Sequence, residues 1–434
     1  MLLNRYIQRS ARTTIAWNTI SQLVGKIVGA GTTFLVGILI ARRFGAEGYG
    51  DFTKIITYVA FFFWIADFGI NAIYLRQQTT EEADDNAWPT LLGLRVIGSV
   101  ILMFIALAFL ALLPQGQTQG YTTFVRLGII VFSPAILFQA LITSTNAVFQ
   151  KNLRYDFATA AVVAGSVFTL LFLFAMTAMR GTWGILMGVM ALFAGSAVTA
   201  CVALLLVRRI AGTIRIVLRV ANMKRMLLPS IPLGLTLFFN LVYFHVDSVI
   251  LTLTRTTAEV GIYGLAYKLF EVPLVLPTFF VNALYPLMLR AFHSSERTTN
   301  DEFMHLVRRS MITLVVLSFV TGIFLWIVAP YMTLIRSDFA ASVPVLRILI
   351  MSLPIFFVSS LTMWILITLG KQKLLMVIYG TGMIINVFLN AYFIPRYGYI
   401  AAAWITVMSE GFVLALSGFT VYKILPGTKS DETH

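Results

Sequence analysis

The stretch Ala41-Arg-Arg-Phe-Gly-Ala-Glu-Gly-Tyr-Gly-Asp-Phe52 is a charged, glycine-rich hinge between two long apolar runs. A degenerate copy of this hinge begins at Ala258, near the middle of the chain. In both places a Tyr-Gly pair is followed four residues later by a lysine, and the two lysines, Lys54 and Lys268, are 214 residues apart. A repeat of this length predicts two half-chains of similar design.

Composition indicates that the chain lies in a membrane. Of its 434 residues, 59% are hydrophobic and 12% are charged, and the mean hydropathy is +0.87. Soluble domains carry roughly a quarter charged residues, so this chain lacks the polar surface to face water on all sides. Apolar runs of about 20 residues, long enough to span a bilayer, recur along the whole length. We therefore predict an all-α polytopic membrane protein.

The pattern of apolar runs predicts about twelve transmembrane helices in two pseudo-symmetric six-helix lobes. The expected spans are 14–41, 50–77, 88–113, 120–148, 155–179, 182–207, 226–253, 260–288, 305–329, 343–369, 373–394 and 398–422.

The two lobes are expected to join through a basic, amphipathic cytoplasmic linker at 208–225, which leaves an N-terminal lobe at 1–207 and a C-terminal lobe at 226–434. Lys and Arg accumulate in cytoplasmic loops. Counted over alternate loops with the N-terminus inside, they number 20 inside and 9 outside, and the outside count includes Lys54 near the start of the second span. This ratio predicts that both termini are cytoplasmic and that the two halves are parallel repeats, with a cleft between them.

The net charge of +14 fits basic loops and an anionic substrate, and in a membrane protein it gives no reason to expect nucleic acid. The sequence contains no Cys/His cluster, no phosphate-cradling glycine loop with a lysine and no nucleophile elbow. Cys201 is the single cysteine, so no intrachain disulfide can form. We therefore expect that the protein is not an enzyme and that it binds no catalytic metal and no cofactor.

The chemistry is expected to come from ionisable groups at membrane depth. A charge there costs at least ~2.5–3.5 kcal/mol on insertion scales, so each group needs a partner, a water-filled cavity or a function. The residues in question are Lys26, Asp67, Arg95, His245, Asp247, Lys268, Glu271 and Glu410.

A structural role competes with a functional one at most of these positions. Lys26 near the middle of the first span suits either a substrate-facing site or an ion pair, and Asp67 suits either coupling or backbone capping at a glycine break. Lys268 and Glu271 lie three residues apart on a helix and can neutralise each other. His245 and Asp247 lie two apart, hence on different faces, and are not expected to pair.

Two arginines are also related by the repeat. Arg95 and Arg309 are 214 residues apart, and both lie near the predicted cytoplasmic ends of equivalent spans. Their guanidinium forks match phosphate oxygens, so the pair could bracket a phosphate group. The alternative is ordinary snorkelling of both side chains to the inner interface.

Four motifs in this order carry a family resemblance. They are Arg43-Phe-Gly-Ala-Glu-Gly-Tyr-Gly, Asp67-Phe-Gly, Gly261-Ile-Tyr with Lys268 shortly after it, and Arg396-Tyr-Gly-Tyr-Ile-Ala-Ala-Ala. The set resembles the polysaccharide transporter family, the Wzx-type O-antigen and exopolysaccharide flippases. This family belongs to the multidrug/oligosaccharidyl-lipid/polysaccharide exporter superfamily.

The resemblance implies a V-shaped pair of six-helix lobes in the bacterial inner membrane. Members move an undecaprenyl-pyrophosphate-linked oligosaccharide from the inner to the outer leaflet by alternating access, alongside glycan polymerase and chain-length proteins. Such a substrate needs a cationic, water-filled lumen, and carboxylates are the usual coupling device in transporters. Candidate substrate-binding residues are Lys26, Arg95, Lys268 and Arg309, and candidates for coupling a proton or a sodium ion are Asp67, Asp247, Glu271 and Glu410.

Two rival functions remain at this stage. A cation-coupled drug exporter would share the fold but should bind its substrates through carboxylates and aromatic rings, and the basic lumen candidates argue mildly against it. A membrane glycan polymerase or glycosyltransferase usually carries a long extramembrane loop with catalytic residues, and no predicted loop is long enough.

Overall fold

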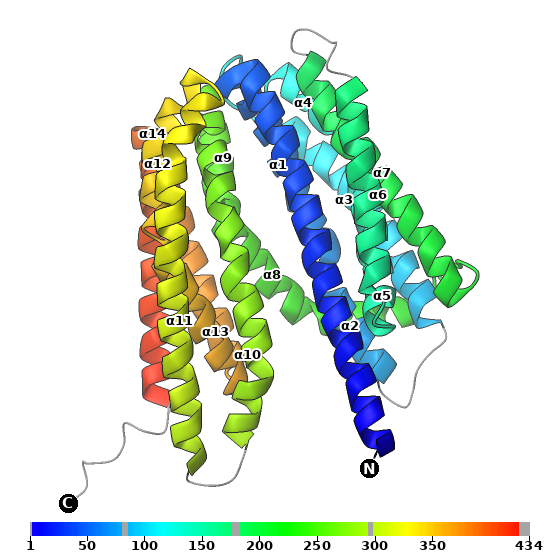
Figure 1. The fold of residues 1–434 in the computed structure, drawn as a ribbon. Coiled ribbons are helices and arrows are strands. Elements are labelled where there is room, and N and C mark those ends of the chain that lie inside the picture. Colours follow the sequence, from blue (N-terminus) through cyan, green and yellow to red (C-terminus); the bar gives the residue numbers. More distant parts are fainter. Residues whose placement is uncertain (1, 80–85, 176–182, 294–297, 425–434) are drawn as a thin grey trace, which may run out of the picture. The chain divides into compact units, whose positions relative to one another are not determined.

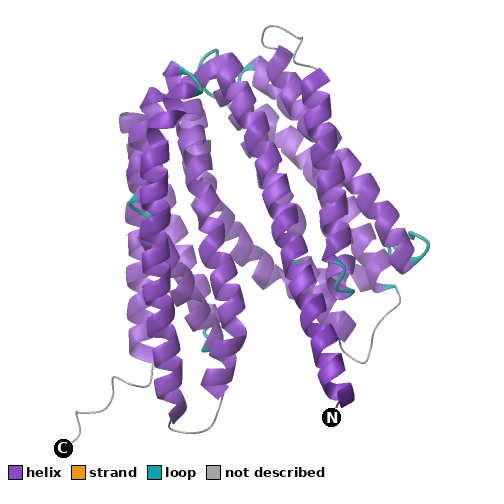
Figure 2. Ribbon diagram, viewed as in Figure 1, coloured by secondary structure: helices purple, strands orange, loops and turns teal. Residues whose placement is uncertain are grey.

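The structure is a computed structural model that describes residues 2–79, 86–175, 183–293 and 298–424. Helices joined by short loops make up this part of the chain, and no strand occurs in it (Figure 2). The all-α prediction is confirmed. The acidic part of the loop at 80–85 lies outside the described residues, as do three cations of the loop count: Arg180, Arg297 and Lys429.

The chain forms two compact units, Met1–Leu241 and Val242–His434, which divide within helix α8. The first unit contains α1 (Leu2–Asp67), α2 (Ile70–Thr79), α3 (Ala87–Leu112), α4 (Thr123–Phe132), α5 (Ala135–Lys151), α6 (Tyr155–Ala175), α7 (Trp183–Ala211) and the first part of α8 (Val220–Thr254). The second contains the rest of α8, α9 (Thr257–Glu271), η1 (Val272–Leu274), α10 (Val275–His293), α11 (Thr298–Val328), η2 (Ala329–Leu334), η3 (Ser337–Ala341), α12 (Ser342–Ile350), α13 (Leu353–Thr368) and α14 (Gln372–Ile424).

Each predicted span has a helical counterpart in the described chain. Among the described residues, nine helices are long and apolar enough to cross a membrane, and a tenth candidate is the α12–α13 stretch, bent by 41°. Two of the nine are too long for one crossing, because about 20 residues suffice. These are the 62-residue stretch that contains most of α1 and the 53-residue α14, and each covers two predicted spans. The predicted lobes at 1–207 and 226–434 stay a prediction.

The two long helices break at glycines with a left-handed φ. Gly45 has φ 71° and ψ −166°, and Gly398 has φ 66° and ψ −151°. Glycine populates this region of backbone space and other residues essentially do not. The first break lies inside the hinge sequence. The hinge copy likewise lies at a helix boundary. Helix α8 ends at Thr254 and α9 begins at Thr257, and the hydroxyl of the N-cap residue Thr256 accepts a hydrogen bond from the Glu259 amide.

Two of the sequence motifs meet at the second of these breaks. Arg255 forms an ion pair with Glu259 at 2.8 Å and donates a hydrogen bond to the Pro395 carbonyl at 3.4 Å. A Cβ on Gly398 would lie only 2.7 Å from the Glu259 carboxylate. The hinge copy and the Arg396-Tyr-Gly motif therefore pack on each other, which is a structural role.

Close helix contacts in the first unit depend on small residues. A Cβ on Gly165 of α6 would lie 1.9 Å from the Thr199 hydroxyl, and one on Gly195 of α7 would lie 1.8 Å from the Thr169 hydroxyl. Helices in membranes associate through such small-residue contacts, because lipid provides no hydrophobic driving force. In the second unit, α11, α13 and α14 pack side by side (Figure 1).

Candidate functional site

A buried carboxylate lies at the centre of the second unit. Glu410 on α14 is 2% exposed. The Tyr243 hydroxyl on α8 donates to its Oε2 at 2.8 Å, and the Ser359 hydroxyl on α13 donates to its Oε1. Side chains from three helices therefore meet at Glu410, for which the sequence had indicated no hydrogen-bond partner.

A second buried carboxylate lies one helical turn beyond Tyr243 on α8. Asp247 accepts a hydrogen bond from the Tyr263 hydroxyl on α9 and one from the Ser248 backbone amide at 2.6 Å. It is 4% exposed. The His245 ring lies edge-on against Tyr267, with the ring centroids 6.3 Å apart.

Neutral polar side chains extend this region along α14. The Asn386 amide donates to the Ser409 hydroxyl at 3.1 Å, and the Asn390 amide donates to the Asn386 side-chain oxygen at 2.9 Å. The Asn390 side-chain oxygen is buried without a hydrogen-bond partner. Ser409 directly precedes Glu410. We refer to the following residues as the oxygen cluster: Tyr243, Asp247, Ser359, Asn386, Asn390, Ser409 and Glu410.

The charge balance of the oxygen cluster is unusual. Within the described part of the chain, no lysine or arginine forms an ion pair with Asp247 or Glu410. A buried, unpaired carboxylate is costly, so such a group is neutralised by a proton or by a bound cation. No three His, Cys, Asp or Glu side chains converge among the described residues. An all-oxygen donor set of this kind suits a proton or a hard cation better than a transition metal.

The first unit contains an ion pair that the sequence did not predict. The Arg95 Nη2 atom lies 2.8 Å from Asp67 Oδ1 and donates to the Asp67 backbone carbonyl at 3.3 Å. Asp67 ends α1, and Phe68 and Gly69 follow with φ of 41° and 69°. A Cβ on Gly69 would collide with Leu233 of α8. Arg95 therefore caps the end of α1 at the glycine break, where capping by Asp67 was expected.

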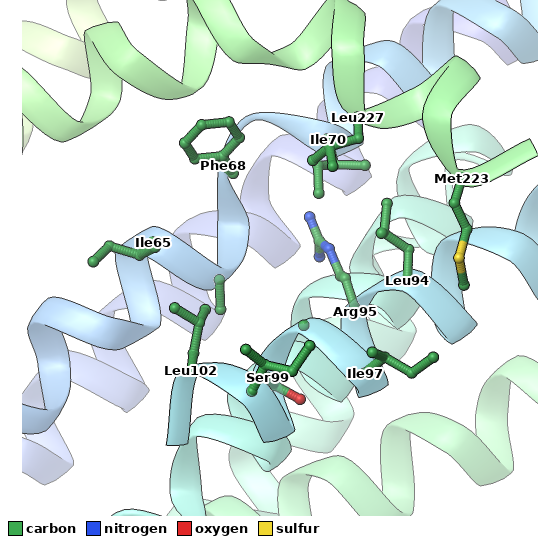
Figure 3. A pocket seen from close by; sticks show the side chains of 13 residues that line it. Ile65, Phe68, Ile70, Leu94, Arg95, Ile97, Ser99, Leu102, Met223 and Leu227 are labelled. Atoms are coloured by element: carbon green, nitrogen blue, oxygen red, sulfur yellow. The ribbon is translucent and has the colours of Figure 1, made fainter. Parts of the chain in front are cut away.

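Arg95 also points into an apolar cavity of about 380 Å³. Its side chain is 1% exposed, and its Nε and Nη1 atoms are buried without a hydrogen-bond partner among the described residues. Figure 3 shows the guanidinium directed away from α3 toward the turn at Phe68 and Ile70. The lining residues are Ile65, Ala66, Phe68, Ile70, Leu94, Arg95, Ile97, Gly98, Ser99, Ile101, Leu102, Met223 and Leu227.

The other predicted cations are accessible. Lys26 of α1 and Arg309 of α11 are exposed on their respective units, and Arg309 lines a pocket of about 490 Å³ with His305 and Arg308. Lys268 lies 3.0 Å from Glu271, and these side chains are 42% and 30% exposed. The predicted neutralisation of this pair is confirmed.

The loop count misplaced one cation. Lys54 was assigned to an outer loop, but it lies inside α1 and is 1% exposed. Its Nζ atom donates to the Gly120 carbonyl at 2.9 Å, which anchors the 113–122 loop. Lys268, its counterpart in the repeat, is partly exposed. The lysine at this motif position thus contacts a backbone carbonyl in the first unit and a glutamate side chain in the second.

Over residues 15–292, well over half of the chain, the sequence matches the family model described as polysaccharide biosynthesis protein. Residues 232–392 also match the MatE family model. No curated protein sequence matches the chain.

Solved structures share the fold over nearly the whole chain. The lipid II flippase MurJ in an inward closed conformation is 15% identical with a TM-score of 0.73, over 94% of this chain and 87% of that one. An inward-facing multidrug resistance MATE family transporter is 12% identical with a TM-score of 0.72, over 95% and 100%. A MOP superfamily transporter from Pyrococcus furiosus is 14% identical with a TM-score of 0.60, over 95% of each chain. At these identities the similarity shows the fold.

Proposed function

Because the chain belongs to the polysaccharide biosynthesis protein family, within the multidrug/oligosaccharidyl-lipid/polysaccharide exporter superfamily, we propose that it is a lipid-linked oligosaccharide flippase. It moves polyprenyl-pyrophosphate-linked repeat units from the inner to the outer leaflet by alternating access. The family match over residues 15–292 carries this proposal. The fold that the chain has in common with MurJ supports it, since that protein is described as a lipid II flippase.

The substrate proposed here combines a pyrophosphate and a sugar with a long apolar tail. Its head group needs accessible cations. We assign this contact to Lys26, Lys268 and Arg309, whose side chains are exposed or partly exposed on their units. We leave Arg95 out of this set, because the cavity that it lines is apolar except for Ser99 and offers the sugar of this substrate no hydrogen-bond partners.

Coupling to an ion is assigned to the oxygen cluster. Asp247 and Glu410 are the buried carboxylates that lack an ion-pair partner among the described residues, whereas Asp67 and Glu271 each pair with a cation. A carboxylate that takes up a proton or a sodium ion in one conformation and releases it in another can drive transport.

The proposal places the protein in the bacterial inner membrane with both termini in the cytoplasm. The loop charge ratio of 20 to 9 supports this orientation. It puts Arg309 near the cytoplasmic surface, where a lipid-linked pyrophosphate made in the cytoplasm would first meet the protein.

Deletion of the gene tests the function directly. If the protein is a flippase, undecaprenol-linked repeat units should accumulate on the inner leaflet, and surface glycan should disappear. Re-expression of the chain should restore both. Unchanged glycan together with altered drug sensitivity would instead identify a drug exporter, the second candidate, which the MatE match over 232–392 favours. Loss of polymer with repeat units accumulating on the outer leaflet would identify a polymerase.

A further inference from the structure

The cavity around Arg95 has a composition that the transport cycle proposed above does not explain. We propose that it binds an anionic membrane phospholipid, with the phosphodiester on the Arg95 guanidinium and an acyl chain along the apolar walls. This lipid is a resident ligand of the first unit and is distinct from the transported substrate. The site lies where α3 and the first turns of α8 meet the break between α1 and α2.

The guanidinium is the first argument for a phosphate. Asp67 occupies Nη2, and both Nε and Nη1 are buried without an acceptor. A buried donor without a partner costs about 1–3 kcal/mol, so native structures rarely keep one without a reason. Two donors on one planar guanidinium suit the oxygens of a phosphate. The oxygens of a single phosphodiester would therefore accept hydrogen bonds from both of these Arg95 donors.

The cavity walls define the rest of the ligand. Apart from Arg95 and Ser99, the lining side chains are apolar, and the Ser99 hydroxyl is already donated to the Val96 carbonyl. Sugar hydroxyls placed here would be left unpaired, which costs more than it gains. An alkyl chain has no such requirement. The volume of about 380 Å³ lies in the range of ligand pockets.

The surrounding charges select an anionic lipid over a zwitterionic one. Met223 and Leu227 line the cavity from α8, and on the same turns Lys224 and Arg225 are exposed, as is Arg219 just before them. The segment before Arg219 is held against α3 by a hydrogen bond from the Val217 amide to the Pro89 carbonyl at 3.1 Å. Basic residues near a membrane surface each contribute about 1 kcal/mol of attraction to anionic lipid.

A cavity-filling variant tests the proposal. Gly98 lines the cavity on α3, and a Cβ there meets nothing within 4 Å, so Gly98→Leu should occupy the space without strain. Gly418 on α14 is equally open, and Gly418→Leu is the matched control. The probes are phosphatidylglycerol, phosphatidylcholine, inorganic phosphate and undecaprenyl phosphate. Each is added to the detergent-purified full chain and followed by native mass spectrometry and thermal unfolding.

Phosphatidylglycerol should bind the wild-type protein and raise its unfolding midpoint, with phosphatidylcholine and inorganic phosphate at least tenfold weaker. Gly98→Leu should lose this binding at least tenfold, and Gly418→Leu should keep it. Arg95→Lys retains the charge but removes the fork, and should weaken binding several-fold. Equal binding to wild type and Gly98→Leu would overturn the proposal. So would a site that prefers undecaprenyl phosphate, or inorganic phosphate alone. None of these outcomes depends on whether the protein is a flippase.

Discussion

Replacing Glu410 by alanine or by glutamine separates its structural role from its proposed role in coupling. Alanine removes the acceptor of the Tyr243 hydroxyl and leaves that donor buried, at a cost of about 1–3 kcal/mol. Ser359 loses less, because its hydroxyl also reaches the Phe356 carbonyl at 3.3 Å. The missing side-chain atoms leave a cavity, which raises the total to about 2–5 kcal/mol.

Glutamine has the same shape and keeps an acceptor, and hydroxyl groups can rotate to meet its amide. Glu410→Gln should therefore cost no more than about 1 kcal/mol of stability. Transport should nevertheless fall to background, because an amide can neither take up a proton nor neutralise a sodium ion.

Thermal unfolding in detergent and transport of a lipid-linked substrate into the opposite leaflet of proteoliposomes measure the two effects. Ser417→Ala is the control. It removes one buried hydroxyl of α14 that bonds Thr362 at 2.9 Å, outside the oxygen cluster, and should leave transport intact. The reasoning is refuted if glutamine destabilises the protein as much as alanine does, or if the glutamine variant transports normally.

Three further predictions concern the fold. Gly398→Ala should lower the free energy of unfolding by at least about 1–2 kcal/mol, because φ at this position is +66° and the new Cβ would contact the Glu259 carboxylate. Gly418→Ala, at an open position, should be neutral or stabilising. Gly165→Leu should cost about 1–3 kcal/mol by forcing α6 from α7, measured as a lowered unfolding midpoint. A double-mutant cycle on Lys268 and Glu271 should give a coupling of no more than about 1 kcal/mol, since both side chains are partly exposed; a larger value would place the pair in a drier environment.

The sequence predicted the fold well because membrane spans are encoded locally. About twenty apolar residues and a glycine break are visible in any window of the chain. The break at Gly45 and the boundary before α9 were readable for this reason. The bend between α12 and α13 was not predicted, although Pro354 at the start of α13 is a local signal for a break in the helix. Lys54 was misplaced because a loop count cannot distinguish a lysine in a loop from one in the turn of helix beside it.

The candidate site was predicted only in part. Charged residues at membrane depth stand out in a sequence, so Asp247 and Glu410 were found. The residues that surround them were not found, because serine, asparagine and tyrosine are also common in membrane spans that have no function. The contact between Asp67 and Arg95 depends on how α1 and α3 pack, and no spacing rule reports a pair 28 residues apart on different helices.

The two units thus use related sequences for different electrostatics. In the first unit, the buried cations each have a protein acceptor: Arg95 meets the Asp67 carboxylate, and Lys54 meets a backbone carbonyl. In the second unit, the buried charges are acidic, and Asp247 and Glu410 have hydroxyl donors without a cation among the described residues. A group that must gain and lose a cation during transport cannot also be tied to a permanent one. The asymmetry therefore favours the second unit as the place where an ion would act.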